Sequence, residues 1–410
     1  MSDYHLHTMP NGIRIIHKQV THTKIAHSGF ILDIGSRDEN PDQLGLAHFW
    51  EHMAFKGTQK RKSFHILNRL ETVGGELNAY TTKEKLCFYA SVLDKHFEKA
   101  FELLTDITFH SVFPAKEIEK ERGVILEEMA MYLDTPEEAI VDEFDGVVFQ
   151  GHALGNNILG TRESVSGFRK PDFLRFIQDN LSTDRLVFCS VSNLPFDKVV
   201  KLAQKYLKHL PAISKERSRT PFGQYQARHL TLEKPIMQAH CVLGCPAYAL
   251  ADERRIPFFL LTNILGGPGM NSRLNLGVRE KHGLVYTIDA NYATYLDTGL
   301  FGIYFGTEKK QLQRTTALVM KELKRIREKT LGTLQLHTAK EQLMGQLAMA
   351  EESNIGLMMM LGKSILDLEK VESLNEIFDQ IRRIDAHQLQ DIANEILQED
   401  KLSTLNYIPA

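Results

Sequence analysis

The stretch LAHFWEHMAFKGT, residues 46–58, decides how the rest of the chain is interpreted. His48 and His52 are four residues apart. If this stretch is helical, that spacing places both imidazoles on one face, close enough to share one ion. Glu51 stands directly before His52, in the order His-x-x-Glu-His. Two histidines with a carboxylate beside them are the residue types from which a hydrolytic zinc site is built.

The order of this motif is the reverse of the commoner zinc-protease helix and is typical of the inverzincin arrangement. In that chemistry His48 and His52 bind zinc through neutral nitrogens, and Glu51 takes a proton from the attacking water. A chance origin has to be weighed, because the chain has 17 His and 52 Asp plus Glu in 410 residues. Such a string arises by chance in fewer than about one chain of this composition in ten. The remaining sequence decides between a metal site and two ordinary histidines.

Length and composition limit the possible classes of protein. A chain of 410 residues exceeds one ordinary core, so two or more domains are expected. A hydrophobic content of 43% and a charged content of 25% are typical of a soluble globular protein. The net charge of -3 gives no electrostatic basis for binding nucleic acid or an acidic membrane surface. The four cysteines are scattered in apolar runs, which predicts reduced core residues.

The sequence shows no signal peptide and no run as long as a membrane helix. Its most apolar run, IPFFLLTNIL at residues 256–265, is too short to span a bilayer. We therefore expect a cytoplasmic protein without a membrane partner. Five histidines near the N-terminus lack an acidic residue at ligand spacing and are predicted to lie at the surface: His5, His7, His17, His22 and His27.

A predicted hairpin follows the motif. Residues 28–34 have the pattern of a buried strand, and residues 63–73 are amphipathic at helical spacing. The stretch GGELNAYTTKEKLCFYASVL, residues 74–93, then predicts two paired strands. A strand that ends near a catalytic site can offer its edge to an extended peptide. The alternative is an ordinary internal hairpin.

A zinc site with two histidines needs a third protein ligand and an open position for water. The natural donor is the charged helix predicted after Pro114, which carries five glutamates. Glu121 and Glu128 are seven residues apart and share a face, whereas Glu127 points elsewhere. Spacing alone does not choose among these glutamates.

The second half of the chain repeats the order of predicted strands and helices found in the first half. Residues 211–229 are polar, basic and rich in turn residues, which indicates a linker. Beyond it come a strand, a helix, a glycine loop, a hairpin and a helix. We predict an α+β fold of two homologous domains, each a mainly antiparallel sheet packed against helices. The predicted boundaries are 1–212 for the zinc-binding domain, 213–229 for the linker and 230–410 for the C-terminal domain.

Several segments together carry a family likeness. The chain resembles the pitrilysin/insulysin family of inverzincin metallopeptidases over essentially its whole length. It is most similar to the short members, the bacterial processing proteases and the β subunit of mitochondrial processing peptidase. The segments that stand in family order are HFWEHMAFKGT, GGELNAYTTKE, KERGVILEEMAMYLDTPEE, ALGNNILGT and REKHGLVY.

The resemblance implies a catalytic centre with one zinc ion per chain. His48, His52 and Glu128 would be the zinc ligands and Glu51 the general base. Glu121 matches the supporting carboxylate of the family, two turns before Glu128.

The resemblance also implies substrate contacts and an assembly. Asn78 and Ala79 match the edge-strand residues that hold the substrate backbone. Arg279 and Tyr286 match a pair that contacts the peptide carbonyl and stabilises the oxyanion. In short members two chains close the chamber, so this pair would act across a homodimer on the zinc of the second copy.

The implied function is that of a zinc-dependent endopeptidase that cuts oligopeptides or unfolded segments inside a closed dimeric chamber. The alternative is a non-catalytic or partner subunit of a heterodimeric processing peptidase.

Overall fold

The computed structural model describes residues 4–217 and 219–410, and their contacts divide the chain into two compact units. Each unit is assembled from three separate segments. The first unit comprises Met1–Met129, Asn156–Arg219 and Ala350–Glu372, and the second comprises Ala130–Gly155, Thr220–Met349 and Ser373–Ala410.

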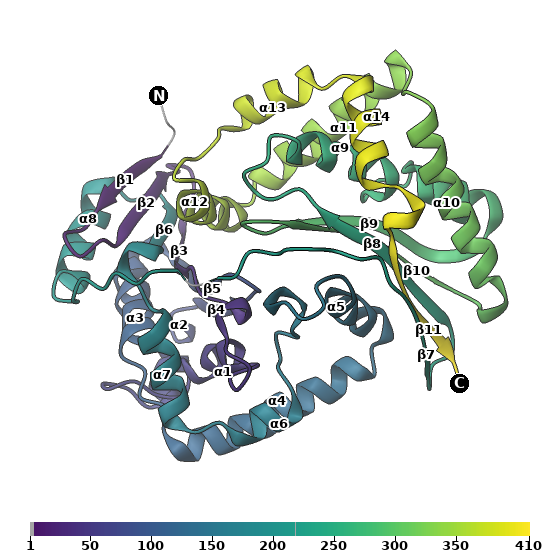
Figure 1. Cartoon of the computed structure of the whole chain (residues 1–410). Coiled ribbons are helices and arrows are strands. Elements are labelled where there is room, and N and C mark those ends of the chain that lie inside the picture. The colour runs from purple at the N-terminus through teal and green to yellow at the C-terminus, as the bar shows by residue number, and fades with distance from the viewer. Residues whose placement is uncertain (1–3, 218) are drawn as a thin grey trace. The chain divides into compact units, whose positions relative to one another are not determined.

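The first unit is built on a six-stranded sheet of order β1-β2-β6-β3-β5-β4 (Figure 1). β2 and β6 are parallel, and the other neighbours are antiparallel. β4 and β5 form the predicted hairpin, and β4 is an edge of the sheet. The strands are β1 His5–Thr8, β2 Arg14–Gln19, β3 Ile25–Leu32, β4 Glu76–Thr81, β5 Leu86–Leu93 and β6 Leu186–Ser192.

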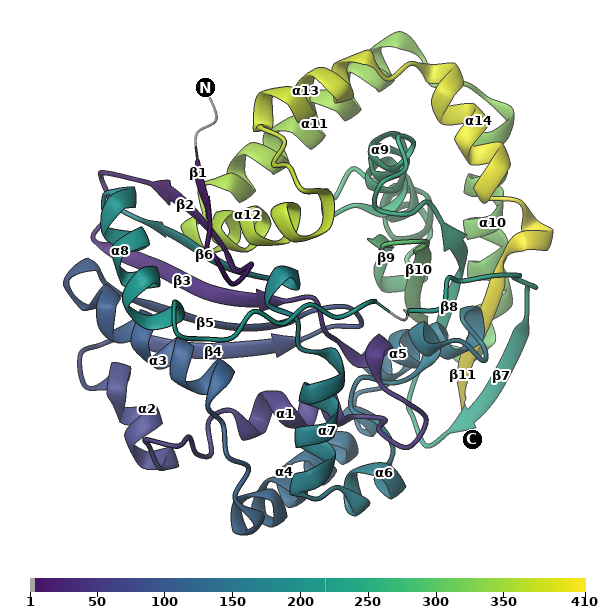
Figure 2. The ribbon, with the colours of Figure 1, turned by 60° about the vertical axis from the view of Figure 1, so that its left-hand side comes forward.

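This sheet is apolar on both faces, because successive strand residues point to opposite sides. One face carries Ile15, Phe30, Phe88 and Phe188, and the other carries Ile16, Ile31, Cys87 and Cys189. Figure 2 shows α3 on one side of the sheet and α12 on the other. The helices of this unit are α1 Leu46–Met53, α2 Ser63–Glu71, α3 Phe97–Phe109, α6 Arg162–Gly167, α7 Lys170–Asn180, α8 Phe196–Leu207 and α12 Asn354–Leu368.

The helix α12 lies close against its sheet at Gly362. A Cβ atom at this position would lie 2.7 Å from Cδ1 of Ile31 and 2.9 Å from Sγ of Cys189. Only a residue without a side chain permits this approach. Both Cys87 and Cys189 are buried free thiols, as are Cys241 and Cys245, which confirms the predicted reduced core cysteines.

The second unit is built on a five-stranded sheet of order β7-β11-β8-β10-β9, in which β7 and β11 are parallel and the other neighbours antiparallel. Val242, Leu405 and Tyr407 face α5, and Leu243, Phe301 and Phe305 face the core under α9 and α10. The strands are β7 His229–Lys234, β8 Ala239–Ala247, β9 Val285–Thr294, β10 Gly299–Thr307 and β11 Ser403–Pro409.

The remaining helices complete the chain. Those of the second unit are α5 Pro136–Val148, α9 Arg255–Gly266, α10 Leu312–Glu328, α13 Leu374–Arg383 and α14 Ala386–Ile396, with the π-helical turn η5 at Asn275–Glu280. Two long helices, α4 Ala115–Leu133 and α11 Thr333–Glu351, each contain a boundary between the units.

The α+β class and the two mainly antiparallel sheets are confirmed. The passage from Arg219 to Thr220 falls inside the predicted linker, residues 213–229. Two helices belong to the unit formed mainly by the other half of the chain. α5, from the N-terminal half, is part of the second unit, and α12, from the C-terminal half, is part of the first unit. No sequence pattern predicts this exchange. The predicted domain boundaries themselves stay a prediction.

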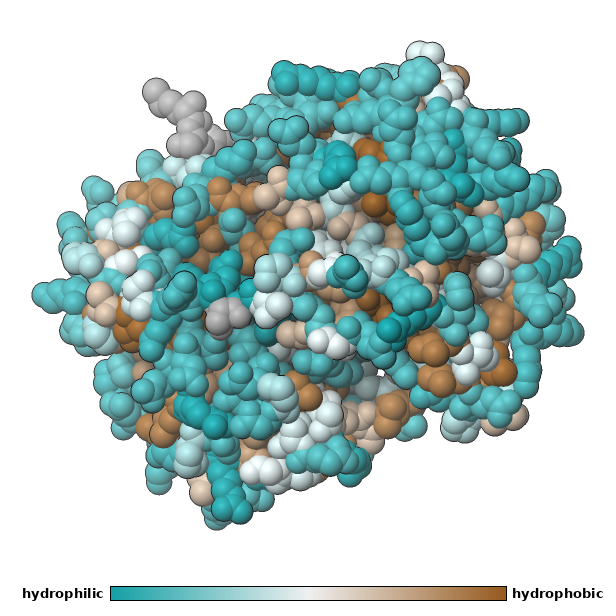
Figure 3. Space-filling view, viewed as in Figure 1, coloured by the Kyte–Doolittle hydropathy of each residue, from teal (hydrophilic) through white to brown (hydrophobic). Residues whose placement is uncertain are grey.

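Among the described residues, no helix is both long and apolar enough to cross a membrane. Hydrophilic side chains dominate the face of the molecule drawn in Figure 3. The prediction that His17 lies at the surface is wrong, because its side chain, on β2, is fully buried beside Ser190 of β6 and Phe196 of α8. A histidine can be buried when both ring nitrogens have partners, and here they contact Ser190 and the Leu194 carbonyl.

Candidate metal centre

The helix α1, which carries the His-x-x-Glu-His motif, is fixed at its start and along its apolar face. Gly45 precedes it with φ 92°, a conformation that favours glycine. The buried Glu39 carboxylate accepts hydrogen bonds from the N–H groups of Gly45 at 2.9 Å and Ala47 at 2.7 Å. It therefore satisfies donors that a helix N-terminus leaves unpaired. The apolar face is buried through Leu46, Phe49, Trp50 and Met53.

This anchoring leaves the two histidines on the opposite face, toward α4. The rings of His48 and His52 have centroids 4.6 Å apart. Oε2 of Glu128, on α4, lies 3.8 Å from Nε2 of His48 and 3.6 Å from Nε2 of His52. These three residues form the group of possible metal ligands found among the described residues. The structure thus brings together the three residues predicted as zinc ligands.

The donor set of this group fits zinc. Tetrahedral coordination with bonds of about 2.0–2.1 Å places neighbouring ligand atoms about 3.3 Å apart. The two histidine–glutamate distances of 3.8 and 3.6 Å are slightly longer, and ligand atoms of all three residues lie within 4.8 Å of one another. Two imidazoles and one carboxylate leave a fourth position open, which is the composition of a catalytic zinc site.

His52 is oriented by Glu121, one of the glutamates that spacing left open. Nδ1 of His52 lies 2.9 Å from Oε1 of Glu121, and Nζ of Lys56 lies 2.6 Å from Oε2. Burial would raise the pKa of Glu121, but hydrogen bonds from His52 and Lys56 outweigh it and hold that pKa below its usual value. The ionised carboxylate accepts the Nδ1–H proton, which leaves the Nε2 lone pair of His52 available to a metal.

His48 is kept neutral by its surroundings. Burial, and then the neighbouring His52, lower the pKa of His48 to about 3. A histidine binds a metal through an unprotonated nitrogen, so this environment suits a ligand.

The Glu51 carboxylate is not one of the three possible metal ligands, and it is hydrogen-bonded to Thr81. Its Oε2 accepts a hydrogen bond of 2.6 Å from Oγ1 of Thr81, at the end of β4. Burial raises the pKa of Glu51, and the Thr81 hydrogen bond opposes that rise. A carboxylate with a raised pKa, next to a metal site, has the properties of a general base.

Asn78 and Ala79, predicted as substrate contacts, lie in β4. They pair with Tyr89 and Phe88 of β5 on one side. On the other side no strand among residues 4–217 and 219–410 pairs with β4, so its outer backbone groups are available for an added strand. The same strand carries Thr81, which contacts Glu51.

Arg279 and Tyr286 belong to the second unit. The structure places them next to each other, with the Arg279 guanidinium 5.6 Å from the centre of the Tyr286 ring. Arg279 lies in η5, and Tyr286 lies at the start of β9 with 85% of its surface exposed. Their predicted roles concern a substrate and a second chain, and stay predictions.

Sequence reasoning missed Thr81 and Lys56. Both stand inside segments that carry the family likeness, but no spacing rule connects Thr81 to Glu51, 30 residues away. Lys56 follows His52 by four residues, and its ammonium group contacts the Glu121 carboxylate. Only the packing of β4 and α4 against α1 reveals these contacts.

The fold and the site define a class of two-unit α+β proteins with a His-x-x-Glu-His helix and an additional carboxylate from a second helix. Comparison with known families agrees with this description. The family model described as Insulinase (Peptidase family M16) matches residues 14–162, and that described as Peptidase M16 inactive domain matches residues 168–343.

Relatives match over nearly the whole chain. A Bacillus subtilis protein named "Uncharacterized zinc protease YmxG" is 33% identical over 394 residues, which is 96% of each chain. The yeast mitochondrial-processing peptidase subunit beta is 29% identical over 96% of this chain and 89% of its own. The chain therefore belongs to peptidase family M16.

Solved structures support the fold. A Pseudomonas fluorescens structure described as a peptidase M16 inactive domain superimposes with a TM-score of 0.92 and 19% identity, covering 100% of this chain and 98% of that one. A Helicobacter pylori protease gives a TM-score of 0.90 at 19% identity, covering 99% of both chains.

Proposed function

We propose that this protein is a zinc-dependent endopeptidase that hydrolyses oligopeptides or unfolded segments. The observation that carries the proposal is the convergence of His48, His52 and Glu128 next to the Glu51 carboxylate. Relatives named zinc proteases support a metallopeptidase, and the donor set fits zinc.

The proposed mechanism assigns a separate task to each group. A bound zinc ion would supply a Lewis acid that polarises the peptide carbonyl and acidifies water. Glu51 takes a proton from the attacking water and later gives it to the leaving amine. Its raised pKa suits the first step, because a more basic carboxylate accepts a proton from water more readily, and the protonated Glu51 can then donate to the leaving amine. Glu121 keeps His52 in the tautomer that a metal ligand requires.

Substrate binding in this proposal uses the free edge of β4. An extended peptide would pair with the backbone at Asn78 and Ala79, and its scissile bond would lie near Glu51 because Thr81 ends the same strand. Arg279 and Tyr286 would contact the peptide carbonyl and stabilise the oxyanion. We propose that two copies of the chain close a chamber in which this pair serves the site of the second copy. The exposure of Tyr286 is compatible with that role.

The test is the substitution Glu51→Gln in the full-length chain. The variant should bind zinc as the unmodified protein does, because Glu51 is not a proposed ligand. Its cleavage of a quenched fluorescent peptide should fall by at least about a hundredfold, the lower range for a lost general base. Unchanged cleavage would remove Glu51 as the base. Loss of zinc from this variant would contradict the assignment of ligands.

A second candidate function is that of one subunit in a heterodimeric processing peptidase. The yeast relative is named as the β subunit of the mitochondrial-processing peptidase. The purified chain separates the two proposals: a self-sufficient homodimer elutes at twice the chain mass and cleaves peptides alone. A partner subunit is inactive until a second, different chain is added.

A further inference from the structure

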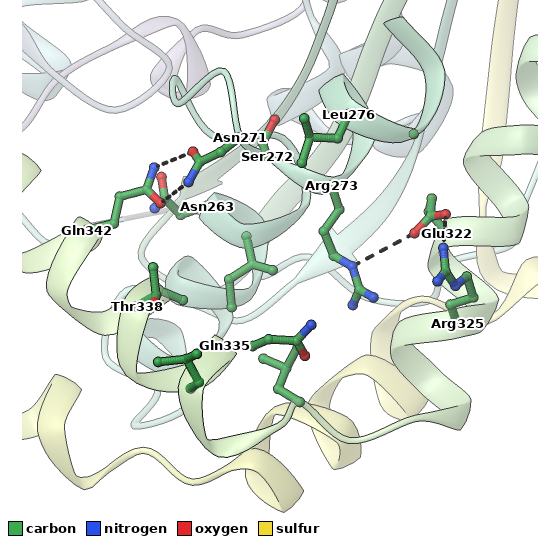
Figure 4. Close-up of a pocket in the computed structure, with 15 residues that line it drawn as sticks. Asn263, Asn271, Ser272, Arg273, Leu276, Glu322, Arg325, Gln335, Thr338 and Gln342 are labelled. Carbon is green, nitrogen blue, oxygen red and sulfur yellow. Dashed lines mark hydrogen bonds and ion pairs between the residues drawn. The ribbon is translucent and has the colours of Figure 1, made fainter. Parts of the chain in front are cut away.

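The second unit contains a cavity that the proposed function does not use. It has a volume of about 530 Å³ and is lined by α9, the glycine loop before η5, η5 itself, α10 and α11. Figure 4 shows the lining residues. Cavities of 300–1,000 Å³ with an apolar wall and a few polar groups are typical ligand sites.

The cavity occupies a position related to the metal centre by the internal repeat. In the first unit strand β3 is followed by helices α1 and α2, hairpin β4–β5, and helices α3 and α4. In the second unit strand β8 is followed by helix α9, the π-helical turn η5, hairpin β9–β10, and helices α10 and α11. The metal centre lies between α1 and α4, and the cavity lies between their counterparts α9 and α11. Here Asn263 and Gln342 supply amides in place of imidazole and carboxylate. Amides are poor zinc ligands, so this cavity suits an organic ligand.

One end of the cavity is positively charged. Arg273 and Arg325 contribute two guanidinium groups and Glu322 one carboxylate, which leaves one positive charge. Glu322 pairs closely with Arg325, at 2.7 Å, and only distantly with Arg273, at 3.8 Å. Nη1 of Arg273 is buried and has no hydrogen-bond partner among the described residues. A buried donor without a partner is costly. The Arg273 side chain as a whole is 25% exposed and lines the cavity, so its guanidinium group can reach a carboxylate of a ligand there.

Ser272, which also lines the cavity, provides a second unsatisfied group. Its side chain is 5% exposed, and within the described chain its hydroxyl also has no partner. In Figure 4 the Arg273 side chain extends into the middle of the lining residues, with Glu322 to one side.

The rest of the lining matches a peptide. Leu276 and Leu334 are 50% and 76% exposed and form part of an apolar wall together with Leu331. Asn271 and Gln342 exchange two hydrogen bonds, of 3.2 and 3.1 Å. Each amide keeps one further N–H and one acceptor position, which can pair with a peptide unit.

We propose that this cavity binds the carboxyl end of a peptide whose last side chain is apolar. Arg273 holds the terminal carboxylate, the leucines cover the last side chain, and the amides of Asn271 and Gln342 pair with the preceding peptide bond. The site uses none of the residues of the proposed metal centre. A fatty acid also combines a carboxylate with an apolar chain, but it has no peptide group with which the amides could form hydrogen bonds.

The test measures binding to the full-length chain by titration calorimetry. The probes are acetyl-Ala-Ala-Leu as the free acid, the same peptide as its C-terminal amide, and octanoate. The free acid should bind at least about tenfold more tightly than the amide, since a charge-assisted hydrogen bond is lost. Equal binding of acid and amide, or no binding of the acid, would overturn the proposal. Octanoate that binds as tightly as the tripeptide acid would overturn the peptide assignment.

Two variants locate the site. Arg273→Met should remove the preference for the acid, and Arg273→Lys should restore part of it. Leu334→Asp, at a position with 76% of its surface exposed, should weaken binding of the acid at least about tenfold by charge repulsion. The matched control is Leu174→Asp on α7, which is 46% exposed and does not line the cavity. If Leu174→Asp weakens binding of the acid as much as Leu334→Asp does, the peptide does not bind in this cavity. Chromatography confirms that the peptide stays intact, so the result is independent of whether the chain cleaves peptides.

Discussion

Nδ1 of His52 lies 2.9 Å from Oε1 of Glu121, so a carboxylate on α4 decides which nitrogen of an α1 histidine carries the proton. The second oxygen of Glu121 contacts Lys56. Glu121 therefore connects the motif helix to the helix that supplies Glu128, and directs the free nitrogen of His52 toward that residue.

The first prediction concerns this support. Glu121→Ala should weaken zinc binding by about 10–100-fold, the usual effect of losing a carboxylate behind a histidine ligand. Competition with a chromophoric chelator measures the affinity. Glu127→Ala, at an exposed position on the same helix, is the control and should bind zinc normally. An unchanged affinity in Glu121→Ala would show that His52 needs no such support.

The second prediction separates the neighbouring glutamates of α4. Glu128→Gln should lose zinc during dialysis, because a neutral amide is a much poorer ligand than a carboxylate. Glu127→Gln differs by one position on the helix and should keep one zinc per chain. Metal content measured by atomic emission gives the answer. Retention of zinc by Glu128→Gln would contradict the role of Glu128 as third ligand.

The third prediction concerns pH and the buried His17. Burial lowers the pKa of His17 below the ordinary 6.5. The folded state thus binds a proton less readily than the unfolded chain. Stability from neutral His17 is present above pH 6.5 and is lost as the pH falls toward the folded-state pKa.

Urea unfolding of the unmodified chain and of His17→Gln, between about pH 7.5 and 5.5, tests this effect. The unmodified chain should lose stability more steeply, by at most about 1.4 kcal/mol per pH unit. His22→Gln, at an exposed position, should follow the unmodified chain. Parallel curves for His17→Gln and the unmodified chain would show that His17 does not titrate as its burial requires.

The fourth prediction concerns Arg219, whose side chain is only 4% exposed. It contacts Asp33 at 3.0 Å and Asp38 at 2.7 Å. Arg219→Met removes a positive charge that pairs with the buried carboxylates of Asp33 and Asp38. We expect this substitution to destabilise the protein by about 3–5 kcal/mol.

The control is Arg175→Met. Arg175 pairs with Asp42 at 2.8 Å, but the two side chains are 52% and 63% exposed, so the loss should stay below about 1 kcal/mol. Denaturant midpoints of the two variants should differ clearly. Similar midpoints would mean that the buried Asp33 carboxylate is sufficiently stabilised by its other partners and does not need Arg219.

The sequence predicts those parts of the site that lie on regular elements. The spacing of His48 and His52, the hairpin at residues 74–93 and the helix after Pro114 follow from periodicity and turn residues, and the structure has all three. The choice of Glu128 over Glu121 needed the family resemblance, because both share a face of α4. Contacts made by tertiary packing, such as Thr81 with Glu51 or His17 with Ser190, have no local signal.

The placement of α12 has a consequence for how the chain is made. This helix covers the face of the first sheet that carries Ile31 and Cys189, yet it is encoded after most of the second unit. A ribosome must pass residue 372 of 410 before the first unit has all of its segments. A nascent chain that stalls near Arg219 would hold a sheet with one bare apolar face, which chaperones would have to shield until translation is nearly finished.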